Sequence, residues 1–138
     1  MKKTRTPSRL RKLVIDALRR HAWNMGVSEF IGDILWKSED KLSEDGYKIQ
    51  AEINVDRRYL RATLSIYPIF IVDWKERGDS ETERVIAHEV AHIATAHLYY
   101  LATCIYKDSG EMKDAWETLT ERIGRLSVKV DELLRKKR

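Results

Sequence analysis

Mostly apolar side chains recur at spacings of three and four residues along the first part of the chain. Such spacing places them on one face of a helix. The positions are Leu10, Leu13, Val14, Ala17, Leu18 and His21. Thr6 and Pro7 form a typical helix start, with threonine as the cap and proline at the first helical position. The pattern predicts an amphipathic helix over Pro7–Trp23, and Gly26 ends that region.

Three segments then have the character of β-strands. Val27–Trp36 is a mixed candidate, whereas Tyr47–Val55 and Leu60–Tyr67 alternate between apolar and polar residues with a period of two. A strand of that kind has one face on the core and the other in water. Pro68 ends the third strand, and the short link between the last two makes them a hairpin. We therefore expect a small three-stranded sheet that is mainly antiparallel.

The remaining pattern is helical. We expect a loop at 38–46 and a connector at 68–78, after which Ser80 and Glu83 form a capping box that opens a second helix. A break at 107–110 separates it from a last helix over Glu111–Lys136. Apolar residues there again follow helical spacing: Met112, Ala115, Trp116, Leu119, Ile123, Leu126, Val130, Leu133 and Leu134. The order predicts an α+β fold in a single domain, residues 1–138.

Composition limits the class of protein. The chain has 138 residues, 43% hydrophobic and 35% charged, which is typical of one globular domain. The single cysteine, Cys104, excludes an internal disulfide framework and suits a reducing compartment. No apolar stretch follows the basic N-terminus, so we expect no signal peptide. The longest uncharged run, Val90–Tyr106, is short for a membrane span. We expect a cytoplasmic protein that does not bind membranes, with a monomer favoured.

The net charge of +4 comes largely from basic residues at the two ends of the chain. Basic tails can bind nucleic acid or acidic partners, but they also serve as solvated ends that keep a protein soluble. No basic stripe interleaved with aromatic residues is present, so nucleic acid is an unlikely partner.

One segment carries candidate chemistry. His88 and His92 lie four residues apart on the second helix, so both imidazoles project from one face and can bind a single zinc ion. Glu89 lies beside the first histidine and points to one side, where it can take a proton from a zinc-bound water. Small and apolar residues surround the pair, which keeps such a site dry. A core helix with two hydrogen-bonded histidines is the alternative reading.

A catalytic zinc needs a third protein ligand. His97 stands five residues after His92, which turns it about 140° away on a straight helix. Glu117 and Glu121 share one face of the last helix, so one can bind zinc while the other accepts the Nδ1–H of a ligand histidine. A simple antiparallel hairpin would leave Glu117 short of the metal. We therefore expect the second helix to end or bend near Leu98–Leu101, or the two helices to cross steeply.

The motif His88-Glu89-Val90-Ala91-His92, followed by the segment Ala115–Ile123, resembles the gluzincin clan of zinc metallopeptidases. The likeness is to its minimal single-domain members, including small peptidases encoded by phages and prophages. That resemblance implies a zincin-like order of elements: an N-terminal helix, a short sheet, the active-site helix and a helix that bears a glutamate. It implies His88, His92 and Glu117 as ligands of one Zn2+, and Glu89 as the general base. Glu121 would support His88 and stays the alternative third ligand.

The resemblance also implies that a peptide or protein substrate pairs with an edge strand of the sheet. That strand would be Leu60–Tyr67, with the residues Leu60, Arg61, Ala62, Thr63, Leu64, Ser65, Ile66 and Tyr67. Hydrolysis further requires a donor for the developing oxyanion. Five residues could supply it, and the sequence does not choose among them: Tyr99, Tyr100, Tyr106, His97 and Arg122.

These features predict a zinc-dependent hydrolase that cleaves peptide bonds. Two alternatives stay open. One is a nucleic-acid-associated protein with a structural zinc or none, and the other is a metal-binding regulatory protein without turnover.

Overall fold

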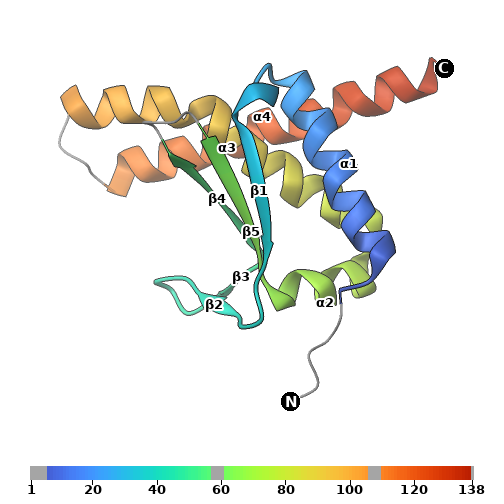
Figure 1. Ribbon diagram of the computed structural model, residues 1–138. Coiled ribbons are helices and arrows are strands. Elements are labelled where there is room, and N and C mark those ends of the chain that lie inside the picture. The colour runs from blue at the N-terminus through green and yellow to red at the C-terminus, as the bar shows by residue number, and fades with distance from the viewer. Residues whose placement is uncertain (1–5, 57–60, 106–109, 138) are drawn as a thin grey trace.

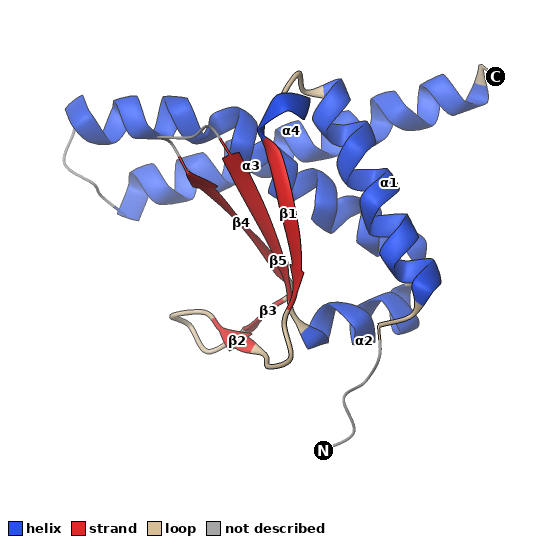
Figure 2. Ribbon diagram, viewed as in Figure 1, coloured by secondary structure: helices blue, strands red, loops and turns tan. Residues whose placement is uncertain are grey.

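A computed structural model of the chain describes residues 6–56, 61–105 and 110–137. The chain folds as an α+β structure in which helices lie behind and beside a small sheet (Figures 1 and 2). The elements are α1 (Ser8–Asn24), a short 3-10 helix η1 (Ser28–Phe30), β1 (Ile31–Trp36), β2 (Lys41–Leu42), β3 (Lys48–Ile49), β4 (Ala51–Asp56), β5 (Arg61–Ile66), α2 (Pro68–Arg77), α3 (Asp79–Ile105) and α4 (Gly110–Lys136).

The three-stranded sheet has the order β1-β5-β4. β4 and β5 form the predicted antiparallel hairpin, but β1 pairs with β5 in parallel, so the sheet is mixed and the expectation of a mainly antiparallel sheet is wrong. β5 is central, with partners on both sides over Ala62–Ile66. The expectation that Leu60–Tyr67 is an edge strand is therefore also wrong for its described residues. Alternation reveals which side chains are buried, but not which strand pairs with which.

Several local predictions need correction. The expected connector at 68–78 is mainly helix α2, which begins at Pro68, buries Phe70 and ends at Gly78 with a φ of +83°. α1 is capped by Pro7 itself, without a side-chain hydrogen bond from a cap residue. Part of the expected loop at 38–46 forms β2, which pairs with β3 in a separate two-stranded sheet.

The predicted capping box does not form. α3 begins at Asp79, so Ser80 already lies inside the helix. Glu83 turns its carboxylate toward α1 instead, where it contacts Arg20 and the Nε2 atom of His21. The Glu83 side chain thus forms a tertiary ion pair with α1 in place of the predicted capping interaction at the start of α3.

α3 is helical throughout Asp79–Ile105, so the expected end near Leu98–Leu101 does not occur. In Figure 1 α4 instead crosses α3. Three small or polar residues of α4 are buried: Thr120, Gly124 and Ser127. This burial is unusual, because the apolar stripe of a helix ordinarily faces the core.

One hydrophobic core lies between the sheet and the helices. Its buried members come from α1, the strands, α2 and α3, and include Leu10, Val14, Leu64, Ile66, Phe70, Ile86 and Val90. The first half of α3 is thus packed on several sides, which gives the histidine-bearing turn a rigid support. Within the described residues, none of the helices is both long and apolar enough to cross a bilayer.

Candidate metal centre

α3 and α4 bring three potential ligand atoms together. The Nε2 atoms of His88 and His92 lie 3.1 Å apart, and Oε2 of Glu117 lies 3.5 Å from the first and 3.6 Å from the second. Atoms bound at about 2.0–2.1 Å in a tetrahedron around zinc are about 3.3 Å apart. The three atoms therefore have the spacing of ligands around one such ion, and within the described residues they form a group that could hold a metal.

Glu121 orients His88. Its Oε2 atom lies 2.6 Å from Nδ1 of His88, a contact that fixes the ring with Nε2 facing His92 and Glu117. Arg125 holds the other carboxylate oxygen at 2.8 Å, and Arg84 lies 3.8 Å from the same atom. Burial lowers the pKa of His88, but hydrogen bonds with Glu117 and Glu121 and the nearby Glu89 outweigh it and raise that pKa above its usual value.

His92 is neutral at physiological pH. Burial lowers its pKa to about 4, against the opposing influence of the Glu117 carboxylate. A neutral imidazole is the form that binds metals. The edge of its ring packs against Trp116 at a centroid distance of 4.8 Å, and the indole N–H of Trp116 donates to Oγ1 of Thr95 at 2.8 Å. The position of the His92 ring is thus fixed by packing. Its Nδ1 atom is buried and has no hydrogen-bond partner among the described residues.

Glu89 is almost fully buried, with 7% of its surface exposed. Burial raises the pKa of its carboxyl to about 8, although the charge of His88 and a hydrogen bond from the Ile53 backbone act in the opposite direction. Ile53 belongs to β4, so this contact joins the histidine-bearing turn of α3 to the edge of the sheet. A carboxyl with this pKa can take up and release a proton near neutral pH.

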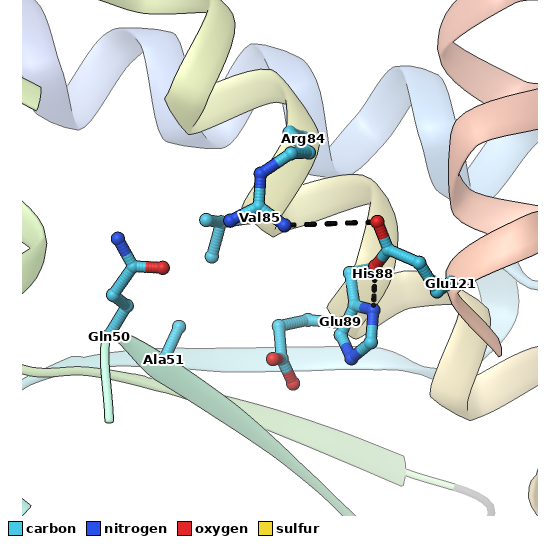
Figure 3. Close-up of a pocket in the computed structure, with 7 residues that line it drawn as sticks. All are labelled: Gln50, Ala51, Arg84, Val85, His88, Glu89 and Glu121. Carbon is cyan, nitrogen blue, oxygen red and sulfur yellow. Dashed lines mark hydrogen bonds and ion pairs between the residues drawn. The ribbon is translucent and has the colours of Figure 1, made fainter. Parts of the chain in front are cut away.

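A cavity of about 200 Å³ opens beside these groups (Figure 3). Its lining comes from three parts of the chain: Gln50 just before β4 and Ala51 at its start, Arg84, Val85, His88 and Glu89 on α3, and Glu121 on α4. Figure 3 shows the Glu89 carboxylate pointing toward the strands and Arg84 reaching toward Glu121.

Four residues that line the cavity were not predicted from the sequence: Gln50, Ala51, Arg84 and Val85. Helical spacing could have indicated Arg84, because it lies one turn before His88 and hence on the same face. Gln50 carried no comparable signal, since it reads as one polar residue of an alternating strand. Only the packing of β4 against α3 brings it to the cavity.

Tyr99, Tyr100 and Arg122, the expected oxyanion donors whose side chains are described, do not line this cavity. Tyr99 stacks on Trp116 with centroids 4.0 Å apart, and neither Tyr100 nor Arg122 is among the described residues that line the cavity. Tyr106, Leu60 and the side chain of His97 lie outside the described parts of the structure. Among the described residues that line the cavity, Arg84 is the cationic hydrogen-bond donor. It also forms an ion pair with Glu81 at 2.9 Å.

Comparison with protein-family models, with curated protein sequences and with solved structures finds no match for this chain. Membership of the gluzincin clan therefore stays a prediction from the motif and from the order of elements.

Proposed function

We propose that this protein is a zinc-dependent hydrolase, and that it cleaves peptide bonds. The observation that carries the proposal is the triangle of His88 Nε2, His92 Nε2 and Glu117 Oε2, with sides of 3.1, 3.5 and 3.6 Å. The order of α1, sheet, α3 and α4 supports the zincin-like architecture that the sequence resemblance implies.

The donor set fits zinc better than a hard cation. Two imidazole nitrogens and one carboxylate oxygen are usual zinc ligands, whereas magnesium and calcium prefer oxygen alone. Three protein ligands leave a fourth position open, which distinguishes a catalytic from a structural zinc site. Glu121 on Nδ1 of His88 is the supporting carboxylate that such sites commonly contain.

The residues around the cluster suit hydrolysis. Bound zinc supplies a Lewis acid and a water of lowered pKa. Glu89 is positioned to accept a proton beside the cluster and to return it to a leaving nitrogen, because its carboxyl lines the cavity next to His88. The side chain of Arg84 provides a donor at the cavity wall for negative charge that develops during the reaction.

The sheet offers a place for an extended peptide. β4 is an edge strand, packs beside α3 and leads from Gln50 and Ala51 at the cavity. A peptide that adds to this edge would gain main-chain hydrogen bonds and pass next to Glu89. We therefore transfer the substrate-pairing role from β5 to β4.

A comparison of the wild type with Glu89→Gln tests this function. Both proteins should hold one zinc ion per chain, but only the wild type should cleave a library of unfolded proteins or peptides. Glu132→Gln, an exposed change on α4, serves as the matched control and should leave both properties unchanged.

Three results would contradict the proposal. Equal hydrolysis by wild type and Glu89→Gln would exclude Glu89 as the general base. Absence of zinc after purification with zinc present would exclude the proposed zinc site. Stoichiometric zinc in a wild type that cleaves nothing would indicate a metal-binding regulatory protein instead.

A further inference from the structure

The outward side of α4 carries an apolar stripe that is largely exposed in the described structure. Leu119, Ile123, Leu126, Val130 and Leu133 follow one another at steps of four, three, four and three residues. We call these five residues the α4 seam. Leu126 and Leu133 are each 61% exposed, Leu119 and Val130 are also exposed, and Ile123 is half-buried. The spacing is that of the a and d positions of a coiled coil, which pack against a partner helix.

The rest of the domain contacts a different side of α4. Thr120, Gly124 and Ser127 are buried; the Ser127 hydroxyl lies 2.7 Å from Nδ1 of His21 and accepts a hydrogen bond from Asn24, both on α1. Glu117 and Glu121 lie about 160–200° around the helix from Leu119, because each residue advances the helix by about 100°. The last turns of α4 project past α1 in Figure 1. Most of the α4 seam is thus accessible to a partner.

Charge on the flank of the α4 seam indicates the kind of partner. Arg122, Lys129 and Lys136 repeat every seven residues along one side of it. They are exposed, and none of them forms an ion pair with another described residue. In heptad notation they occupy the g positions, which lie opposite flanking residues of a partner helix and select it by charge.

We propose that the α4 seam docks an amphipathic helix of a partner protein whose apolar stripe is flanked by acidic residues. A large exposed apolar patch with a charged rim is typical of such interfaces. The helix would seat its apolar side chains among Leu126, Val130 and Leu133 and place carboxylates against the three cations. This inference does not rest on the proposed hydrolase activity, since it involves the other side of α4.

A second copy of the chain is a poorer occupant. Two antiparallel seams would bring g positions together, so Arg122, Lys129 and Lys136 would meet the same cations. Two parallel seams would place them opposite the e positions, where Thr120 and Ser127 are buried against the domain. Neither arrangement supplies a carboxylate, whereas an acidic helix does.

The test uses two designed peptides and the full chain. Both peptides have four heptads with isoleucine and leucine at a and d, one with glutamate and the other with lysine at e and g. Like charges keep each peptide from pairing with itself. Labelled with a fluorophore, the acidic peptide should bind the full chain in anisotropy titrations at least tenfold more tightly than the basic one. Added salt should weaken that binding.

Variants locate the binding site. Leu126→Ser combined with Leu133→Ser should lower the affinity at least tenfold, and Arg122→Glu combined with Lys129→Glu should reverse the preference between peptides. Leu42→Ser is the control, because Leu42 lies on β2 and is also 61% exposed. Zinc content and thermal unfolding should not change in any variant, since all of these side chains are exposed.

Three outcomes would overturn the proposal. One is no binding of the acidic peptide at 100-fold excess over the chain, and another is equal affinity for both peptides. The third is a concentration-dependent dimer, seen by sedimentation, that the double serine variant abolishes, because a second copy would then occupy the α4 seam.

Discussion

Gly124 lies directly against the backbone of His88. A Cβ atom placed on Gly124 would stand 3.0 Å from the His88 nitrogen and 3.1 Å from its Cα. Backbone atoms in a packed helix cannot move aside as a flexible side chain can. Close approach of α4 to α3 at this point is therefore a condition for bringing Glu117 and Glu121 to the histidines.

Gly124→Ala should push α4 away from α3 and weaken zinc binding several-fold, as measured by competition with a chromophoric chelator. Overpacking should also lower the free energy of unfolding by about 1 kcal/mol or more, despite the better helix propensity of alanine. Gly110→Ala is the matched control, because a Cβ there meets nothing within 4 Å. Unchanged zinc affinity in Gly124→Ala would show that α4 tolerates the displacement.

The roles of Glu117 and Glu121 can be separated. Glu121→Gln should keep the three ligands but lower zinc affinity about 10–100-fold, because it removes the charge that supports His88. Glu117→Gln should lower zinc affinity further than Glu121→Gln does. X-ray absorption spectra of Glu117→Gln should show that the carboxylate has left the zinc coordination shell. If the carboxylate instead leaves the zinc coordination shell in Glu121→Gln, then Glu121 is the zinc ligand and Glu117 is not.

Zinc should stabilise the fold. At a free concentration 100 times the Kd it should raise the free energy of unfolding by about 2.7 kcal/mol, and the Tm by roughly 10 °C, in scanning calorimetry. EDTA should reverse this rise, and Mg2+ should not reproduce it. Glu117→Ala, at a side chain that is 43% exposed, should abolish the rise without unfolding the protein. A full zinc effect in that variant would contradict the ligand set.

The ion pair between α1 and α3 should make stability depend on pH. Burial raises the pKa of Glu83, but hydrogen bonds and charges from His21 and Arg20 outweigh burial and lower it below 4.5. A carboxyl with a lowered folded pKa contributes stability that is complete above its unfolded pKa and is lost as pH falls through the folded value.

Glu83→Gln should therefore lower the free energy of unfolding by about 2 kcal/mol at pH 7, as measured by urea denaturation. The difference from wild type should shrink below pH 4.5, where the native carboxyl also becomes neutral. Glu111→Gln, an exposed change on α4, should show no such trend. A difference that is equal at pH 7 and at the lowest pH of the folded range would exclude this ionic contribution.

Local patterns were informative where they concern one element. Periodicity predicted α1, the β4–β5 hairpin and the two long helices, and the spacing of His88 and His92 placed both on one turn of α3. Local patterns gave wrong predictions where the position or contact of a residue depends on a second element of the fold. β5 lies between two strands rather than at an edge, and Glu83 pairs with α1 rather than with its own helix end.

Spacing along the chain by itself determined the paired histidines with an adjacent glutamate, because a helix converts a separation of four residues into a shared face. Only the tertiary structure decided which carboxylate of α4 lies beside the Nε2 atoms of both histidines and which side of α4 turns inward. The apolar stripe of that helix lies about 80–140° around the helix from the residues that are buried. The crossing needs small residues such as Gly124 and Thr120 at its contact with α3, and a close backbone approach depends on side-chain size rather than on hydrophobicity.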